Sequence, residues 1–281
     1  MAARRLFAAG LTPLDAAIWR AAGAFILLCA FGLIADRPGL RIAVRDLPLL
    51  AAYSAVSVAG FMTIYFTAID LTTVATAAVL LYTAPAWVVV LARVVFGEPI
   101  TPMKTVAVAL TFLGCVLVVG AADSAAVRLT RAGLLAGLGA GFTYALYSIL
   151  GKTALRRLRP QTTVIYTLGL GALVLAVIAR RLPPLPSQSL APLGYTIIFP
   201  TALAYLLYIH GLRWVEAGRA AVVATLEPVV AVAAGALVLQ EPFGPLQWIG
   251  AALVLAGVVL VQGERSLSAA AGSRPPESPP P

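Results

Sequence analysis

Apolar residues run through this chain in long blocks, and charged residues occur mainly between the blocks. Uncharged stretches occupy, for example, residues 71–92, 132–151, 160–179 and 242–263. A helix needs about 20 apolar residues to cross the hydrocarbon core of a bilayer. The pattern therefore predicts an all-α polytopic membrane protein.

The blocks predict nine transmembrane helices separated by mostly short connections. These cover residues 14–35, 47–69, 74–96, 102–121, 131–151, 161–180, 191–212, 218–239 and 245–263. Pro102 and Pro245 suit the first turn of a helix, where a missing backbone N–H costs little. Residues 264–281 are rich in Pro and Ser, which predicts a disordered tail.

The chain contains an internal repeat: residues 65–120 read again at 208–263, at a constant offset of 143. Matching pairs include Tyr65 and Tyr208, Pro85 and Pro228, Glu98 and Glu241, and Gly114 and Gly257. A duplicated apolar unit is typical of secondary transporters, whose substrate site lies between the two repeats near mid-membrane. We divide the chain into a first repeat at 1–122, a second at 131–263, and the tail.

Basic residues predict the orientation of the chain. A cytoplasmic tail places thirteen of them on the cytoplasmic side: Arg37, Arg41, Arg45, Arg93, Lys104, Lys152, Arg156, Arg157, Arg159, Arg213, Arg219, Arg265 and Arg274. Six fall on the opposite side: Arg4, Arg5, Arg128, Arg131, Arg180 and Arg181. The positive-inside rule favours this arrangement, with the protein in the plasma (inner) membrane.

This orientation puts Glu98 and Glu241 on opposite sides, so the two repeats are inverted and each needs an odd number of helices. The second repeat has five predicted helices, whereas the first has four. Pro13 matches Pro160 at an offset of 147, which would map the helix at 131–151 to positions −16 to 4. We expect either a start codon assigned too late or a nine-helix variant that lacks its first helix.

Composition excludes several other classes of protein. The chain is 61% hydrophobic and 11% charged, with a mean hydropathy of +0.96, which is too apolar for a soluble domain. The net charge of +9 comes from short loops, so it indicates membrane topology and not nucleic-acid binding. Cys29 and Cys115 lie in apolar runs and are interpreted as packing residues. We expect no cofactor and no metal.

Glu227 is the leading candidate for a substrate-binding or proton-coupling residue. It lies eight residues beyond Arg219, or about 12 Å along a helix. A carboxylate at that depth costs a few kcal/mol unless it is protonated or faces water or a partner. Its alternative role is a structural hydrogen bond. Arg20 could bind a substrate carboxylate, pair with Glu227, or extend its charged end to the membrane interface.

Other residues join the candidate site less directly. Pro85 and Pro228 are expected to kink their helices beside a cavity. Six aromatic residues could line that cavity, although amphipathic aromatic side chains at helix ends more often anchor a protein at the interface; they are Tyr65, Tyr82, Trp87, Tyr144, Tyr147 and Tyr208. Glu98 and Glu241 each precede a proline and a new helix, so we expect the dipole of that following helix to stabilise them.

Four segments carry a resemblance to a known family. They are TPLDAAIWRAAGAFILL (12–28), TAPAWVVVLARVVFGEPIT (83–101), LEPVVAVAAGALVLQEPF (226–243) and IGAALVLAGVVLVQG (249–263). In order and spacing they resemble the second, fourth, ninth and tenth helices of EamA-type permeases of the drug/metabolite transporter superfamily. That family has ten helices in two inverted five-helix repeats. The chain departs from it in lacking the first helix and in having Gln240 before Glu241.

The resemblance implies export of amino acids or related small metabolites, and it leaves coupling to protons open. The chain is therefore predicted to be a transporter, with a small-molecule substrate and the lipid bilayer as its partners. No catalytic constellation such as an HExxH motif lies in the spans, so we expect no enzyme activity. The competing hypothesis is a non-transporting or inactive truncated membrane subunit, which the missing helix favours.

Overall fold

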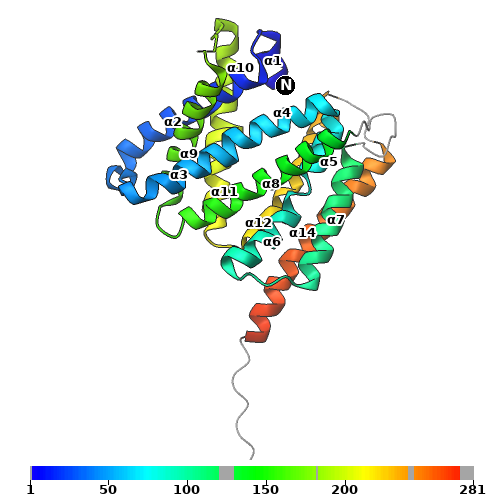
Figure 1. The fold of residues 1–281 in the computed structure, drawn as a ribbon. Helices are drawn as coiled ribbons and strands as arrows, with labels where there is room; N and C mark the ends of the chain where they lie inside the picture. Colours follow the sequence, from blue (N-terminus) through cyan, green and yellow to red (C-terminus); the bar gives the residue numbers. More distant parts are fainter. Residues whose placement is uncertain (1, 120–129, 182, 240–243, 273–281) are drawn as a thin grey trace, which may run out of the picture.

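Every regular element of the described structure is helical (Figure 1). The computed structural model describes residues 2–119, 130–181, 183–239 and 244–272. Within these residues, seven helices are long and apolar enough to cross a membrane, and Pro102–Val118 is a shorter apolar helix. The polytopic all-α prediction is confirmed in this coarser form. The predicted span at 218–239 is divided into two shorter helices.

The first repeat contains α1 (Ala2–Ala8), α2 (Pro13–Ala35), η1 (Arg37–Leu40), η2 (Val44–Asp46), α3 (Leu47–Ser54), η3 (Ala55–Gly60), α4 (Phe61–Leu71), α5 (Val74–Leu81), α6 (Ala84–Phe96) and α7 (Pro102–Val118). The second repeat contains α8 (Arg131–Ala154), α9 (Pro160–Ala179), η5 (Ser187–Ser189), α10 (Leu190–Ile197), η6 (Ile198–Leu203), α11 (Ala204–Leu212), α12 (Ala217–Ala224), α13 (Leu226–Leu239) and α14 (Pro245–Gly272). The first part of the predicted tail, 264–272, thus belongs to α14, and 273–281 lies outside the described residues.

Threonine side chains begin several of these helices. Thr12, Thr73, Thr101 and Thr130 each accept a hydrogen bond from the backbone N–H three residues later. Thr12 and Asp15 form a complete capping box, in which each side chain bonds the backbone of the other. These caps satisfy N–H groups that the first turn of a helix would otherwise leave unpaired.

The sequence repeat is also a structural repeat, and it extends beyond the matching letters. At the offset of 143, α3 coincides with α10 and α5 with α12, residue for residue. The two π-helical segments, η3 and η6, coincide in the same way. Such a segment carries one extra residue per turn and interrupts the regular hydrogen-bond ladder. Both interruptions therefore belong to the repeated unit.

The short helix α1 falls outside the nine predicted helices. It packs against α10 (Figure 1). Leu6 of α1 is buried there with Leu193 of α10 and Ala16 of α2. At the offset of 147, α1 aligns with residues 149–155 at the end of α8. In the first repeat, α1 therefore occupies the position that corresponds to the end of α8 in the second repeat.

The helices α7 and α14 lie side by side and antiparallel (Figure 1). Small residues make this close approach possible. A Cβ atom on Gly114 would lie 2.6 Å from the carbonyl oxygen of Gly250, and one on Gly257 would lie 2.9 Å from that of Ala107. Gly257 is the repeat equivalent of Gly114, and Gly250 is that of Ala107. The contact is thus symmetric between the two repeats, as inverted repeats require.

The long helix α8 packs against α4, α5 and α6 of the first repeat. Its glycines admit the neighbouring chain: a Cβ on Gly137 would lie 2.3 Å from the Leu80 side chain, and one on Gly141 would lie 2.6 Å from Thr83 Oγ1. Small residues at these positions therefore permit close packing of α8. It fixes the position of the turn between α5 and α6.

Several loops gather where α14 ends, and we call this side the tail face. They are residues 36–46, 97–101, 155–159 and 213–216. Ion pairs join them, such as Arg157 with Asp46 and Arg159 with Asp36. The opposite face is held by contacts of its own, including Arg181 with Asp15 at 2.9 Å and Trp19 Nε1 with the Pro184 carbonyl at 3.1 Å.

Candidate functional site

Two predicted helices are interrupted at equivalent positions of the repeats. A turn at Tyr82 and Thr83 separates α5 from α6, and Thr225 separates α12 from α13. The offset of 143 relates Tyr82 to Thr225. Pro85 and Pro228 follow within the first turns of α6 and α13, and both are buried. The expected kink is therefore a local interruption of the helix, because Tyr82, Thr83 and Thr225 keep near-helical backbone angles and Val74–Phe96 remains one span. Interruptions of membrane helices form the ligand sites of many transporters.

Glu227 lies in the first turn of α13, directly after the break. Its side chain keeps an exposed surface, and within the described residues it has no hydrogen-bond or ion-pair partner. The carboxylate interacts electrostatically with four tyrosines: Tyr65, Tyr82, Tyr144 and Tyr205. These come from α4, the end of α5, α8 and α11, so both repeats contribute. The repeat equivalent of Glu227 is Ala84, and the charge is therefore asymmetric.

Arg20 of α2 is partly buried and does not pair with Glu227. Its Nε donates a hydrogen bond of 3.0 Å to Thr201 Oγ1, which lies in the π-helical segment η6. The Thr201 hydroxyl donates in turn to the Thr196 carbonyl at 2.7 Å. The charge of Arg20 also acts on Tyr205, one of the tyrosines near Glu227. Both predicted charged residues thus act electrostatically on Tyr205.

The predicted aromatic residues separate into two groups. Tyr82 lies near Glu227, whereas the Trp87 ring packs edge-on against Phe142 of α8, with centroids 5.5 Å apart. Tyr147 packs against Tyr205 and Tyr208, with centroid distances of 5.4 and 5.9 Å. Tyr147 and Tyr208 are partly buried and pack against the main buried apolar cluster. Whether they line a cavity or anchor the protein at the interface stays a prediction.

The tail face holds a second group of charges, made of Glu98, Lys104, Lys152 and Glu216, which we call the tail-face cluster. Glu98 Oε1 accepts hydrogen bonds from Lys152 Nζ at 2.8 Å and from the backbone N–H of Ala217 at 2.9 Å. The Glu98 carboxylate therefore caps α12, a helix of the other repeat. We had expected stabilisation by the helix that follows Glu98, and the structure corrects this. Glu241 lies outside the described residues.

Lys104 and Glu216 form the second half of the tail-face cluster. Lys104 Nζ lies 2.7 Å from Glu216 Oε2 and donates to the Pro99 carbonyl at 2.8 Å, and only 2% of the lysine side chain is exposed. Partial burial opposes ionisation of Glu216. The hydrogen bond and charge of Lys104, together with the Arg219 guanidinium, outweigh it and hold the pKa of Glu216 below its usual value.

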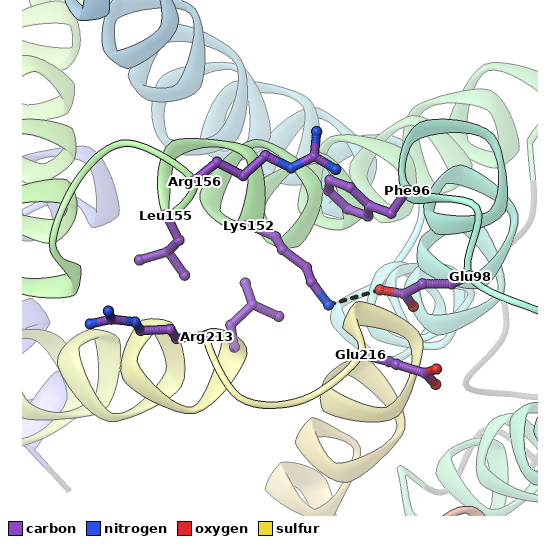
Figure 2. A pocket seen from close by; sticks show the side chains of 8 residues that line it. Phe96, Glu98, Lys152, Leu155, Arg156, Arg213 and Glu216 are labelled. Atoms are coloured by element: carbon purple, nitrogen blue, oxygen red, sulfur yellow. Dashed lines mark hydrogen bonds and ion pairs between the residues drawn. The ribbon is translucent and has the colours of Figure 1, made fainter.

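A pocket opens beside the tail-face cluster (Figure 2). Its volume is about 320 Å³, and its lining comes from both repeats. The lining residues are Phe96, Glu98, Lys152, Leu155, Arg156, Leu212, Arg213 and Glu216. Figure 2 shows the Lys152 amine directed at Glu98, and Arg156 beside the ring of Phe96. None of these residues except Glu98 was singled out from the sequence as a candidate.

No group of three or more His, Cys, Asp or Glu side chains able to hold a metal ion occurs in the part of the chain that the structure describes. Cys29 and Cys115 are both free. The spans and the all-helical fold together define a polytopic membrane protein.

Comparison with known proteins gives the family. The profile of the EamA-like transporter family matches residues 1–120 and 131–262. An "uncharacterized transporter" of Archaeoglobus fulgidus is 32% identical over 220 residues, covering 78% of this chain and 77% of the relative. The "uncharacterized transporter YwfM" of Bacillus subtilis is 29% identical over 218 residues, covering 75% and 72%.

Two further comparisons bear on location and fold. The "uncharacterized inner membrane transporter YicL" of Salmonella typhimurium is 22% identical over 215 residues, covering 73% of this chain and 70% of the relative. A solved crystal structure superposes with a TM-score of 0.78 at 20% identity, covering 94% of this chain and 93% of the other. This chain belongs to the EamA-like transporter family. It is a multi-pass membrane transporter, and the family is one of transporters and not of enzymes.

Proposed function

We propose that the chain exports small polar metabolites, such as amino acids or related compounds, by alternating access. The observation that carries this proposal is Glu227, a carboxylate in the first turn of an interrupted helix that has no hydrogen-bond or ion-pair partner among the described residues. An ionisable group within a membrane domain is expensive unless it is paired or hydrated. A group that stays unpaired is available for a substrate ammonium or for a proton.

The surroundings of Glu227 suit a cationic group. Tyr65, Tyr82, Tyr144 and Tyr205 interact with its charge, and Tyr144 keeps 37% of its surface exposed. Phenol rings attract a cation at their faces and offer hydroxyls at their edges. These tyrosines come from both repeats. A site at this position would therefore change shape when the repeats move relative to each other.

Arg20 supports a substrate that also carries a negative charge. Its Nε is engaged by Thr201, and its charge reaches Tyr205, which also interacts with Glu227. A zwitterion could place its ammonium at Glu227 and its carboxylate toward the Arg20 guanidinium, whose fork geometry matches a carboxylate. Amino acids have this distribution of charge.

The tail-face cluster supports alternating access. Glu98 and Lys104 belong to the first repeat, whereas Lys152 and Glu216 belong to the second. These ion pairs join the repeats at one face, and they must separate if a passage is to open there. We propose that this conformation is closed at the tail face, and that Glu227 exchanges its ligand with the opposite side.

We also propose that the tail face is cytoplasmic and that the protein resides in the inner membrane. The excess of basic residues on that face and the printed location of the Salmonella relative support this. Reporter fusions test it: a C-terminal fluorescent protein that folds only in the cytoplasm should be active, and alkaline phosphatase at the same place should not. The reverse result would overturn the orientation.

Transport itself is tested in proteoliposomes with a panel of amino acids and related metabolites. Each compound is measured with and without a pH gradient, for the unaltered chain and for Glu227→Gln. Asp70→Asn is the matched control, because Asp70 is an exposed acid at the end of α4, away from the break. We expect Glu227→Gln to lower transport by about tenfold or more, and Asp70→Asn to leave it unchanged.

The outcomes separate the hypotheses. If Glu227→Gln transports with unchanged rate and pH dependence, the role of Glu227 is refuted. If the folded, unaltered chain transports no compound of the panel, the alternative of a non-transporting subunit gains support. Arg20→Gln adds a third arm: it should weaken transport of zwitterions more than that of amines without a carboxylate.

A further inference from the structure

Thr201 replaces a backbone hydrogen-bond donor that is missing where α10 continues into η6. In a regular α-helix, the Thr196 carbonyl would accept a hydrogen bond from the backbone N–H of residue 200. That residue is Pro200, which has no N–H. The Thr201 hydroxyl supplies a donor there, because Oγ1 lies 2.7 Å from the Thr196 carbonyl oxygen. The single proton of this hydroxyl is therefore directed at the main chain.

This arrangement leaves the Thr201 oxygen as an acceptor, and Arg20 uses it. Arg20 Nε donates to Thr201 Oγ1 at 3.0 Å, across the contact between α2 and η6. Only 3% of Thr201 is exposed, so its oxygen is shielded from water. A Cβ atom on Gly23, in the turn of α2 that follows Arg20, would overlap the Ile197 side chain. Close packing of α2 against α10 thus holds the arginine beside its acceptor.

The hydrogen bond to Thr201 determines which part of the Arg20 guanidinium stays available. Among the residues that the structure describes, neither Nη1 nor Nη2 of Arg20 has a hydrogen-bond partner, and no carboxylate pairs with it. The N–H donors of the two Nη groups form a fork that matches the two oxygens of a carboxylate. With Nε held by Thr201, this fork has a fixed direction.

The first repeat lacks this arrangement at its equivalent positions. The offsets of 143 and 147 relate Thr201 to Val58 and Arg20 to Thr167. Val58 lies in η3, and α9, which carries Thr167, packs against η3 as α2 packs against η6. Thr167 Oγ1 is buried and has no hydrogen-bond partner in the described part of the chain. Packing of a helix on a π-helical segment therefore does not require the arginine and its acceptor.

We propose that Thr201 is a positioning residue that directs the Arg20 guanidinium toward the carboxylate of a zwitterionic substrate. This inference rests on the proposed binding of such a substrate between Glu227 and Arg20. Thr201 acts through Arg20 and does not itself contact the ligand. Because Nε is already held, the guanidinium loses less conformational freedom when a ligand binds. Thr201 should therefore determine how strongly the protein prefers amino acids over similar compounds without a carboxylate.

Transport kinetics in proteoliposomes test this role. Leucine, threonine and lysine are each compared with the corresponding amide, which keeps the ammonium group and lacks the carboxylate. The test variant is Thr201→Val, and the rescue variant is Thr201→Ser, which restores a hydroxyl. The matched control is Thr111→Val, because the buried Thr111 hydroxyl also donates to a carbonyl of its own helix, that of Ala107 at 2.9 Å. Both substitutions introduce the residue of the other repeat, Val58 and Val254 respectively.

We expect Thr201→Val to raise the KM of transported amino acids by about tenfold, with kcat within about twofold of the unaltered chain. The KM of the amides should not change. Thr201→Ser should restore most of the affinity, and Thr111→Val should alter neither constant. The positioning role is overturned if amino acids and amides are affected equally, or if Thr201→Val and Thr111→Val have the same effect. If Thr201→Val does not fold, Thr201→Ala takes its place.

A second measurement separates this proposal from the proposed function. NMR of the chain with isotope-labelled arginine in nanodiscs follows the Arg20 Nε–H signal, identified by its absence in Arg20→Gln. We expect its exchange with water to be slow in the unaltered chain and in Thr201→Ser, and at least about tenfold faster in Thr201→Val. Equal exchange in the unaltered chain and Thr201→Val would overturn the proposal, whatever is transported. If no compound is transported but the exchange rates differ as expected, the proposed function fails and the orientation of Arg20 by Thr201 stands.

Discussion

The Glu98 carboxylate caps the start of α12, and Glu227 lies in the first turn of the next helix, α13. The surroundings of the two carboxylates are opposite. Glu98 accepts from Lys152 and from two backbone N–H groups of α12, and only 10% of its side chain is exposed. Glu227 begins α13 and has no bonded partner among the described residues. The protein thus supplies hydrogen-bond donors to the Glu98 carboxylate, whereas no described residue donates to the Glu227 carboxylate.

This difference shows how the protein assigns roles to similar residues. A saturated carboxylate fixes the position of the groups around it, because separating them leaves buried charges uncompensated. An unsaturated carboxylate adds little to the fold and keeps its binding capacity for a ligand. Changing Glu98 should therefore lower stability, whereas changing Glu227 should lower transport and leave stability nearly unchanged.

The largest expected effect is that of Glu98→Ala. The substitution leaves the Lys152 amine and the first N–H groups of α12 without their acceptor, at a cost of about 3 kcal/mol. Thermal unfolding of the purified chain in detergent measures it. Glu98→Gln, which keeps an acceptor oxygen, should lose less. Equal losses in the two variants would show that the charge itself is unimportant.

A smaller effect is expected on lowering the pH, and it should depend on Glu216. Since the pKa of Glu216 is lowered in the folded chain, its contribution to stability is present above the pKa of an unfolded glutamate, about 4.3. The contribution is lost as the pH falls through the lower folded value. The unfolding temperature should therefore fall more steeply below about pH 5 for the unaltered chain than for Glu216→Gln. Parallel curves would contradict this.

Glu227→Gln should change stability by less than about 0.5 kcal/mol, because the carboxylate has no bonded partner to lose in the part of the chain that the structure describes. The same thermal assay measures it beside Glu98→Ala. A loss as large as that of Glu98→Ala would mean that Glu227 serves the fold, and the contrast between the two carboxylates would disappear.

The smallest effect is expected for Arg157→Gln. Arg157 Nη1 lies 3.6 Å from Asp46 Oδ1, and 61% of the arginine side chain is exposed. The Asp46 side chain is only 6% exposed, but the guanidinium faces solvent and makes no hydrogen bond to Asp46 Oδ1, so we expect a loss of only about 0.2 kcal/mol. An unfolding temperature close to that of the unaltered chain is expected. A marked loss would indicate that tail-face ion pairs act together as a network.

Much of the fold could be predicted from the sequence, because membrane spans and a constant repeat offset are encoded in the order of residues. The spans, the family and the repeat follow from these signals. From the sequence, Pro85 and Pro228 predicted only kinks, since a proline shows where a hydrogen bond is lost but not how the chain turns there. The π-helical segments η3 and η6 have no proline or glycine pattern in common. Only the structure reveals them.

The candidate site was predicted in part. Glu227 and Arg20 stood out because charge is rare in apolar runs. Their surroundings could not be predicted, since Thr201 beside Arg20 and the four tyrosines around Glu227 lie far away in sequence. Glu98 was assigned to the wrong helix for the same reason: its nearest helix in sequence is α7, whereas its partner in space is α12. Position along the chain cannot reveal contacts between repeats.

The contact between α7 and α14 has a consequence for the history of the chain. Each helix presents the same repeat positions to the other, as two copies of one protein do in an isologous dimer. In such a dimer every substitution occurs twice, so no charge can be placed on one side alone. Joining the copies into one gene removes that restriction. Equivalent positions could then carry different residues, such as Lys104 and Gln247, or Ala84 and Glu227. A symmetric fold thereby acquires an asymmetric distribution of charge.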